Sequence, residues 1–354
     1  MNALGGIIKG RIENDGPISL YDYMKMALGH PVHGYYSHQD PFGEAGDFIT
    51  APEISQMFGE LIGLWAVDVW TKLGNPDKFH LVELGPGNGT LMADALKSAR
   101  LVPEFLAASE IHLIENSARL RAKQAATLES HHVCWHNALP NLEGAPVILL
   151  ANEFFDALPI HQYFYKSDSW RERLVTTMDD GFAFDLSPKA SPLPHAPAAI
   201  NGDVFEVCPE GELIIKQIST ILSKERGAAL IIDYGSTETL LGDSFQALKG
   251  HEYADPLHTP GEVDLTAHVK FNTLAEIAQA HNILVQGPTA QGRFLERLGI
   301  EARHHLLRQK AGNAQKEKLD AQLRRLTSAK EMGTLFKVMA LSHQVSRPTE
   351  GFGD

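Results

Sequence analysis

A glycine-rich turn with an acidic residue in front of it is the chemically most informative motif of this sequence. Residues 79–84 have the apolar character of a buried strand, and they lead into Glu83-Leu84-Gly85-Pro86-Gly87-Asn88-Gly89 before a helical stretch begins. A strand, turn and helix in this order place backbone N–H groups and a helix N-terminus beside a bound ligand. The glycines permit positive φ angles and a close approach of the backbone to that ligand.

The spacing of these glycines separates two classes of cofactor. The dinucleotide fingerprint G-x-G-x-x-G would place its third glycine at position 90, where the sequence has Thr90. The pattern is instead E-x-G-x-G-x-G, and its acid would repel a pyrophosphate but suits the cationic ammonium and sulfonium groups of S-adenosyl-L-methionine. We therefore predict this methyl donor as the cofactor, bound by Glu83, Gly85, Gly87 and Gly89. A nucleotide site and an ordinary glycine-rich turn are the alternatives.

A second acid, Glu115, ends the next apolar run of the sequence. In dinucleotide folds an acid at the corresponding strand end binds the ribose hydroxyls, and we predict the same contact with the ribose of the methyl donor. The gap to the glycine turn is long, and we expect a loop insertion over Leu101–Ser109 to account for it. The alternative is that Glu115 only caps the helix expected over Ser117–Leu128.

A third polar segment, Asn152-Glu153-Phe154-Phe155-Asp156, follows another buried-strand candidate. In an open α/β sheet, ligands bind beyond the carboxyl ends of the strands. We therefore predict Asn152, Glu153 and Asp156 as catalytic residues that hydrogen-bond an acceptor nitrogen, with the two phenylalanines forming a wall around it. The alternative places both aromatic rings in the core and Asp156 at a turn.

The elements that must position these motifs alternate between strands and helices from residue 78 onward, which indicates a mostly parallel sheet in an α/β fold. The strand candidates are Phe79–Leu84, Ile111–Glu115, Val133–Trp135, Val147–Ala151, Ala229–Asp233, Ile283–Gly287 and Leu335–Leu341. Helices over Thr90–Ala99 and Ser117–Leu128 are expected between the first three strands.

The first 75 residues are expected to form an N-terminal helical region. Ile18–Gly29 reads as a short helix capped by Ser19. A longer amphipathic helix is expected over Pro52–Leu73, where apolar residues recur at helical spacing. Thr50 and Glu53 fit a capping box at its start.

The remaining sequence divides into a core and two insertions. We expect the α/β core to comprise residues 76–160 and 200–345. Residues 161–199 interrupt it with a strand meander over His161–Leu186, with a turn at Asp180-Gly181, and with an irregular linker. Residues 293–330 form a helical insertion in which basic and acidic residues alternate, as on a solvated helix face.

Composition excludes several classes of protein. The chain has 354 residues, of which 44% are hydrophobic and 21% charged, as in globular proteins. A net charge of −13 disfavours nucleic-acid binding but suits a cationic partner. No apolar run approaches the roughly 20 residues of a membrane span, and no secretory signal is recognised at the N-terminus.

Cysteine and histidine usage points to a reducing compartment and to no metal. Cys134 and Cys208 are expected to be free thiols in the cytoplasm. The histidine-rich spots have neither the Cys/His spacing nor the i, i+4 spacing of a metal site, so we expect none. These spots are His30, His33 and His38, then His131 and His132, and finally His304 and His305.

Taken together, these motifs resemble the MidA-like family of class I methyltransferases that use S-adenosylmethionine. The matching stretches are Gly46–Ser55, Glu83–Leu91, Asn152–Gln162, Ile232–Gly235, Pro260–Ala267 and Gly333–Val338. Ala51, Asn88 and Lys270 depart from the family pattern, and Lys270 argues against an acidic substrate contact at its position. The resemblance implies a Rossmann-like sheet of seven strands with added helical elements, and protein arginine as the acceptor, for example in a subunit of respiratory complex I.

The expected activity is therefore protein arginine N-methylation. A guanidinium has a pKa above about 12 and is a poor nucleophile, so carboxylates must hold it and align one nitrogen with the methyl group. Glu153 and Asp156 are the candidates, and Glu53 is a third. Glu53 and Asp233 also have structural explanations, in a capping box and a strand-ending turn. The alternative functions are methylation of an amine on a small molecule or nucleic acid, and a non-catalytic assembly factor that keeps the fold.

Overall fold

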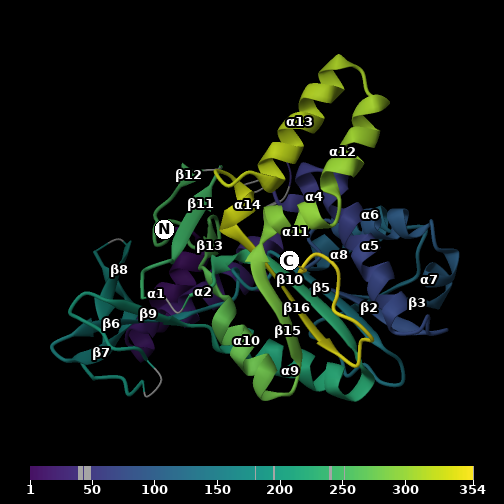
Figure 1. Cartoon of the computed structure of the whole chain (residues 1–354). Coiled ribbons are helices and arrows are strands. Elements are labelled where there is room, and N and C mark those ends of the chain that lie inside the picture. Colours follow the sequence, from purple (N-terminus) through teal and green to yellow (C-terminus); the bar gives the residue numbers. More distant parts are fainter. Residues whose placement is uncertain are drawn as a thin grey trace. The chain divides into compact units, whose positions relative to one another are not determined.

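The computed structural model describes residues 1–38, 43, 49–179, 181–193, 196–238, 241–250 and 252–353 (Figure 1). The chain divides into two compact units. The first comprises Met1–Phe48, Asp156–Leu213 and Glu238–His268, and the second comprises Ile49–Phe155, Ile214–Thr237 and Val269–Asp354. The expected helical region 1–75 thus contributes to both units.

The second unit is built on a mostly parallel sheet with the strand order β15-β16-β10-β5-β2-β3-β4, and β14 pairs with β10 (Figure 1). The strands are β2 Phe79–Leu84, β3 Ser109–Ile114, β4 Val133–His136, β5 Val147–Asn152, β10 Gly227–Ser236, β14 Val269–Lys270, β15 Leu284–Ala290 and β16 Phe336–His343. β16 runs antiparallel to both of its neighbours, while the pairs from β10 to β4 are parallel. The expected Rossmann-like sheet of seven strands is thus present, with the short strand β14 added beside β10.

The apolar runs of the sequence explain why these strands are central. Every residue of β2 and β5 is buried, as expected where helices cover both faces of a parallel sheet. One core lies between this sheet and the helices, with Phe58, Trp65, Phe79 and Phe105 among its largest buried side chains. The helices of this unit are α4 Ala51–Ile54, α5 Gln56–Lys72, α6 Thr90–Ala99, α7 Pro103–Ala108, α8 Ala118–Thr127, α10 Phe271–Ala280, α11 Gln291–Arg297, α12 Ile300–Gln309, α13 Asn313–Thr327 and α14 Met332–Leu335.

Two expectations about these helices are wrong. The single helix over Pro52–Leu73 is broken at Ser55, whose backbone is extended (φ −158°, ψ 135°) and whose hydroxyl caps α5 by accepting from the Met57 N–H. The apolar stripe runs through the break without interruption, so the pattern gave no sign of it. The loop expected over Leu101–Ser109 contains α7, which begins with a proline in its first turn.

The first unit combines N-terminal helices with antiparallel strands. Its elements are α1 Ala3–Asp15, β1 Ile18–Ser19, α2 Leu20–Gly29, α3 Tyr35–His38, β6 His161–Lys166, β7 Ser169–Met178, β8 Gly181–Leu186, β9 Val204–Val207, β11 Gln246–Lys249, β12 Glu252–Tyr253 and β13 Asp264–Thr266. Helix α9, Pro209–Glu225, continues from this unit into the second. β6, β7 and β8 confirm the meander, and Ser19 caps α2 by accepting from the Asp22 N–H.

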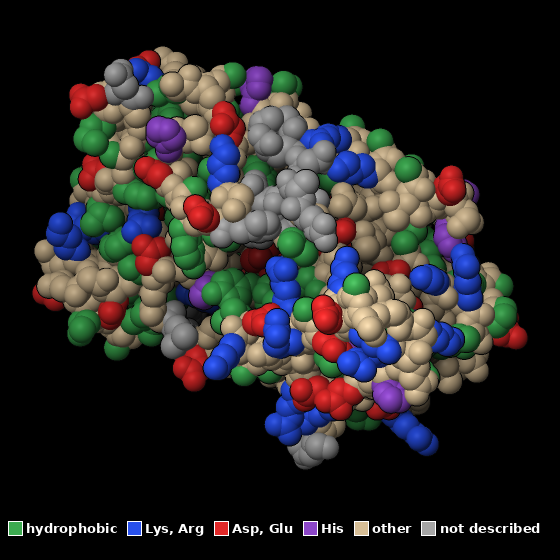
Figure 2. Space-filling view, turned by 90° about the horizontal axis from the view of Figure 1, so that it is seen from above, with side chains coloured by type: hydrophobic (Ala, Val, Ile, Leu, Met, Phe, Trp, Pro, Cys, Tyr) green, Lys and Arg blue, Asp and Glu red, His purple; other side chains and the backbone are tan. Residues whose placement is uncertain are grey.

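The charged insertion before the last strand forms a helical hairpin of α12 and α13 (Figure 1). Asp320 of α13 accepts hydrogen bonds from Arg308 and from the ring of His304 on α12. At its base, Arg303 forms a bidentate ion pair with Glu60 of α5, at 2.7 and 2.8 Å. Figure 2 looks down on the side toward which the hairpin projects, where Lys and Arg alternate with Asp and Glu. The hairpin is thus the solvated face that the sequence indicates.

Three further expectations from the sequence concern the undescribed residues, the cysteines and membrane-spanning helices. Gly46–Phe48 of the family motif and Asp180 of the expected turn lie outside the described residues. Cys134 and Cys208 form no disulfide bond. Among the helices that the structure describes, none is long and apolar enough to cross a membrane.

Candidate active site

The glycine turn after β2 has the geometry of a ligand-binding turn. Gly85, Gly87 and Gly89 all have positive φ, at 60°, 53° and 81°, and Gly89 is the N-cap of α6. A Cβ on Gly85 would lie 2.8 Å from the ring of Phe154, so a larger residue there would meet both strain and a clash. The N-terminus of α6 therefore opens beside a turn whose positive φ angles favour glycine, and at Gly85 a side chain would also clash.

Glu83 is buried in β2 just before this turn. Its side chain is 2% exposed, and its Oε2 has no hydrogen-bond partner among the described residues. Burial raises the pKa of its carboxyl group to about 8. An unpaired buried acid is costly to a folded protein, and a cationic ligand beside it would remove that cost.

Glu53 is directed at the same turn, and the expected capping box is wrong. The Thr50 side chain makes no capping hydrogen bond at the start of α4. Instead Glu53 Oε1 accepts hydrogen bonds from the Thr90 hydroxyl at 2.6 Å and from the Asn88 amide at 3.2 Å. Glu53 thus joins α4 to the first residue of α6, a contact that local sequence patterns do not reveal.

Glu115 follows β3 and is connected to the glycine turn through a buried glutamine. Its Oε1 accepts from the Ser117 N–H at 2.8 Å, and its Oε2 accepts from the Gln124 side chain at 3.2 Å. The same Gln124 amide donates to the Gly87 carbonyl at 2.8 Å, and its oxygen accepts from the Trp135 indole. Burial raises the pKa of Glu115. Glu115 therefore caps the turn before α8, and the Gln124 side chain connects it to the glycine turn.

Gln124 is a site residue that the sequence reasoning missed. It is fully buried on the face of α8 that also carries Leu120 and Leu128. A polar residue in an apolar stripe at i, i+4, i+8 spacing is a signal of a buried hydrogen-bonding role. That signal was available in the sequence.

Asn152 and Glu153 lie where β5 ends. Glu153 adopts the left-handed conformation with φ 50°, which is rare for a residue other than glycine and is often found at functional sites. Its Oε1 accepts from the Ala51 N–H at 3.0 Å and from the Asn152 amide at 3.1 Å. The described residues offer no hydrogen bond to its Oε2, and the Asn152 carbonyl oxygen is buried and unpartnered. Burial raises the pKa of Glu153.

Asp233 holds the loop that follows Glu153. This fully buried carboxylate accepts from the Phe154 and Phe155 N–H groups at 3.1 and 2.8 Å and from the Tyr234 N–H at 2.8 Å. Burial raises its pKa, and the negative charge of Glu153 adds to that effect. Phe155 is buried in the core while Phe154 is partly exposed against Gly85. Asp233 is thus a positioning residue, and only one of the two rings is available as a wall.

Asp156 belongs to the first unit, unlike the other predicted catalytic residues. Its carbonyl accepts from the Ala267 N–H at 3.0 Å. Its carboxylate and that of Asp264 both act on the Tyr36 hydroxyl, which donates to Asp264 at 3.1 Å, and burial together with these charges raises the pKa of Tyr36 well above its usual value. The first unit therefore has an acidic group of its own around Tyr36.

One electrostatic feature unites the site residues of the second unit. Glu53, Glu83, Glu115 and Glu153 converge on the carboxyl ends of β2, β3 and β5, and none of them pairs with a Lys or Arg among the residues described. Buried or partly buried carboxylates without an internal cation suit cationic ligands. The residues present therefore fit a donor that carries an ammonium and a sulfonium group.

The fold and this site define an S-adenosylmethionine-dependent methyltransferase. The family described as "Putative S-adenosyl-L-methionine-dependent methyltransferase" matches residues 61–289, and the chain belongs to this family. Mouse protein arginine methyltransferase NDUFAF7, a mitochondrial protein, is 39% identical over 94% of this chain and 82% of its own length. The human protein of the same name is 36% identical over 94% of this chain and 81% of its own length. The predicted membership of the MidA-like family is confirmed.

A solved structure of a relative supports the same cofactor. The crystal structure of a protein from Burkholderia thailandensis bound to S-adenosyl-homocysteine matches this chain with a TM-score of 0.86 and 27% sequence identity. The match covers 99% of this chain and 94% of that one. S-adenosyl-L-methionine is therefore the cofactor of this enzyme, as predicted from the glycine spacing.

Proposed function

We propose that the enzyme transfers the methyl group of S-adenosyl-L-methionine to an arginine side chain of a protein. The observation that carries this proposal is that Glu53, Glu83, Glu115 and Glu153 form no ion pair with a Lys or Arg among the described residues, although the charges of Arg121 and Arg325 act on Glu115 and Glu153. The donor's cationic groups need only some of these acids, so the remaining charge favours a cationic acceptor over a neutral amine. The names of the relatives from mouse and human support the same acceptor.

We assign donor binding to Glu83, Gly85, Gly87, Gly89 and Glu115. The positive φ angles of the glycines let the turn pass close to the donor. Glu83 supplies a negative charge for its ammonium group, and Glu115 accepts from its ribose hydroxyls through lone pairs not used by Ser117 and Gln124. The bound donor supplies an electrophilic methyl group for in-line displacement.

We assign acceptor alignment to Glu153, Asn152 and Asp156. The Ala51 N–H and the Asn152 amide hold one oxygen of Glu153, so its orientation is fixed while its other oxygen accepts from a guanidinium N–H. The unpartnered oxygen of Asn152 accepts from the same group. Such alignment lowers the barrier mainly through positioning. Asp156, near Tyr36 and Asp264 in the first unit, is the proposed second carboxylate.

The acceptor is tested directly by product analysis. The purified enzyme is incubated with labelled donor and lysate from its own host, and the labelled protein is hydrolysed to its amino acids. We expect methylated arginine, with loss of label when Glu153→Gln replaces the wild type and no loss with Glu104→Gln, an exposed acid on α7. Label on lysine, on a nucleic-acid base or on a small amine would overturn the arginine proposal, and donor binding without any labelled product would favour a non-catalytic assembly factor.

The proposal also includes the acceptor protein and the cellular compartment. We propose a subunit of respiratory complex I as the acceptor, because the family resemblance implies it. We place the enzyme in the cytoplasm, consistent with two cysteines that form no disulfide, whereas the named relatives are mitochondrial. Identification of the labelled protein tests the partner, and cell fractionation tests the compartment.

A further inference from the structure

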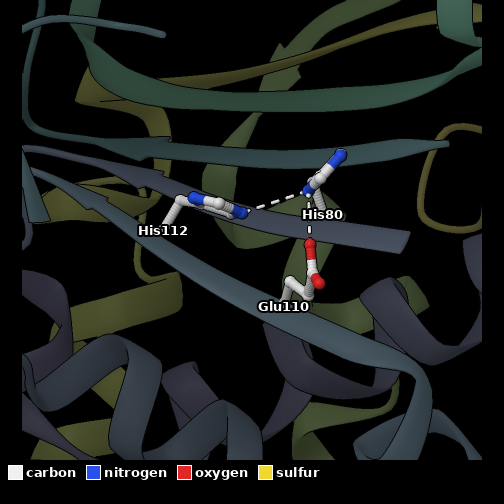
Figure 3. Close-up of side chains that lie close together, drawn as sticks. All are labelled: His80, Glu110 and His112. Carbon is white, nitrogen blue, oxygen red and sulfur yellow. Dashed lines mark hydrogen bonds and ion pairs between the residues drawn. The ribbon is translucent and has the colours of Figure 1, made fainter. Parts of the chain in front are cut away.

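A second polar cluster lies at the opposite end of strands β2 and β3, away from the glycine turn. It consists of His80 on β2 and of Glu110 and His112 on β3 (Figure 3). The side chains of His80 and His112 are 5% and 8% exposed, whereas Glu110 reaches solvent. No role in methyl transfer uses these residues, because they stand near the amino ends of the strands.

The strand register brings the three side chains to one face of the sheet. His80 pairs with Glu110 and Val82 pairs with His112 in the parallel β2–β3 ladder. Alternate residues of a strand face the same side, so Glu110 and His112 point the same way as His80. The histidines are 32 residues apart in sequence, which is why spacing rules for metal motifs did not reveal them.

The nitrogen and oxygen atoms have the separations of a metal coordination sphere. His80 Nδ1 lies 3.0 Å from His112 Nε2 and 3.4 Å from Glu110 Oε2, and the ligand atoms of the three residues all lie within 4.8 Å of one another. Two ligands at the usual zinc distances of about 2.0–2.1 Å in a tetrahedral arrangement lie about 3.3 Å apart. In Figure 3 the His112 ring and the Glu110 carboxylate both point to His80 Nδ1.

The outer nitrogens of both rings have the partners that metal-bound histidines usually have. His80 Nε2 lies 3.4 Å from the Glu143 carbonyl, and His112 Nδ1 lies 3.0 Å from His136 Nε2 on β4. In the metal-bound state such contacts stabilise the tautomer in which the inner nitrogen presents its lone pair to the metal.

We infer that His80 Nδ1, His112 Nε2 and the Glu110 carboxylate bind a divalent transition metal of the zinc type. Two imidazoles and a carboxylate are ligands that Zn²⁺ accepts, whereas Mg²⁺ and Ca²⁺ prefer oxygen alone. In the metal-free protein one proton lies between the two inner nitrogens; when the metal binds, this proton would move to His80 Nε2, which faces the Glu143 carbonyl, and the metal would join β2 to β3. Lys78, which pairs with Glu110 at 2.9 Å, competes with the metal for that carboxylate.

The test is a Zn²⁺ titration of the tag-free, chelator-treated full chain, followed by calorimetry and by the ring-nitrogen NMR signals of histidine. We expect one Zn²⁺ per chain, with shifts at His80 Nδ1 and His112 Nε2. His112→Gln and Glu110→Gln should weaken binding by about tenfold or more. Lys78→Met should strengthen it severalfold because the competing charge is gone. His132→Gln, at an exposed histidine outside the cluster, should change nothing.

Either of two results would overturn the proposed metal site. If Glu110→Gln, whose exposed position does not threaten folding, binds Zn²⁺ as tightly as the wild type, Glu110 is not a ligand and the site as stated is wrong. If the wild type takes up no more Zn²⁺ than His112→Gln does, the cluster is only a row of hydrogen-bonded histidines. Neither outcome bears on donor binding at the other end of the sheet.

Discussion

The two ends of strands β2 and β3 both carry buried polar side chains, but these are acids at one end and hydrogen-bonded histidines at the other. At the carboxyl ends, Glu83 and Glu115 are acids whose pKa values burial raises. At the amino ends, His80 and His112 are imidazoles that bond to each other, and burial lowers the pKa of His112. The acids at the first end form no ion pair with a Lys or Arg among the described residues and therefore suit a cationic ligand, whereas the second end presents ring nitrogens suited to a metal ion.

The two ends also differ in what the buried polar side chains cost the folded protein. A buried acid without a partner destabilises the free protein and is retained where a ligand compensates for it. A row of mutually bonded side chains costs far less, because each donor has an acceptor. Mutations at the carboxyl ends should therefore affect donor binding or transfer, and changes at the amino ends should affect stability.

The largest effect is expected for Glu153→Gln. A neutral amide loses about half the strength of a charged hydrogen bond to a guanidinium, and the resulting misalignment falls on the chemical step. We expect methyl transfer to fall by roughly 100-fold or more, with the donor Kd nearly unchanged, measured by turnover and calorimetry. Asp156→Asn should behave similarly, and the double variant should be little worse than either. Equal turnover by wild type and Glu153→Gln would remove Glu153 from the site.

The next largest effect is expected for Glu83→Gln, which should make the folded protein more stable at pH 8 but weaken donor binding. The folded carboxyl has a pKa of about 8 against 4.5 unfolded, so between these pH values the unfolded chain releases a proton that the folded protein keeps. The free energy of unfolding therefore falls as pH rises through this window. Glu83→Gln lacks this titration, so it should be more stable than the wild type at pH 8, by roughly 1–3 kcal/mol.

The same substitution should weaken donor binding by about tenfold or more, because the donor loses a charged partner. Thermal melts at pH 5 and pH 8 with donor calorimetry measure both effects. A Glu83→Gln variant that is less stable than the wild type at pH 8 would mean that an unseen internal partner satisfies this acid.

A smaller effect is expected for Glu115→Ala. Loss of one charged hydrogen-bond partner should weaken donor binding by about 1–3 kcal/mol. Ser117→Ala is the matched control, because Ser117 caps α8 through the Leu120 N–H without touching the donor turn. Both variants should melt earlier, but only Glu115→Ala should lose donor affinity. If the two variants bind the donor equally well, Glu115 is only a helix cap.

Features formed by neighbouring residues could be predicted from the sequence. The bounds of β2 and α6 agree with the expected Phe79–Leu84 and Thr90–Ala99, because apolar periodicity and the glycines define a strand, turn and helix locally. The cofactor followed from the same local motif. Asn152 and Glu153 were placed correctly at a strand end because parallel strands have a common carboxyl edge.

Features that depend on strand register or helix docking could not be predicted. The bond from Thr90 to Glu53 joins residues 37 apart, and only the packing of α4 against α6 brings them together. The capping box failed for this reason, since a carboxylate that fits a local cap can also reach a distant partner. His80 and His112 meet only in the β2–β3 ladder, and the position of Gln124 depends on how α8 meets the glycine turn.

The smallest effect is expected for Zn²⁺ on donor binding, and it tests whether the two ends of the strands act independently. Saturating Zn²⁺, at about 100 times its Kd, should stabilise the folded protein by about 2.7 kcal/mol because it binds the folded chain alone. The melting temperature should rise by several degrees. The donor Kd should change less than twofold, because the residues of β2 and β3 between the two ends are packed in the buried sheet and Zn²⁺ has no contact with the glycine turn through which to favour one donor-binding state over another. His112→Gln, with a Kd for Zn²⁺ that is tenfold higher or more, should gain at most about half of this stabilisation at the same Zn²⁺ concentration. A Zn²⁺-induced change in donor Kd that disappears in His112→Gln would show that the two ends are coupled through β2 and β3.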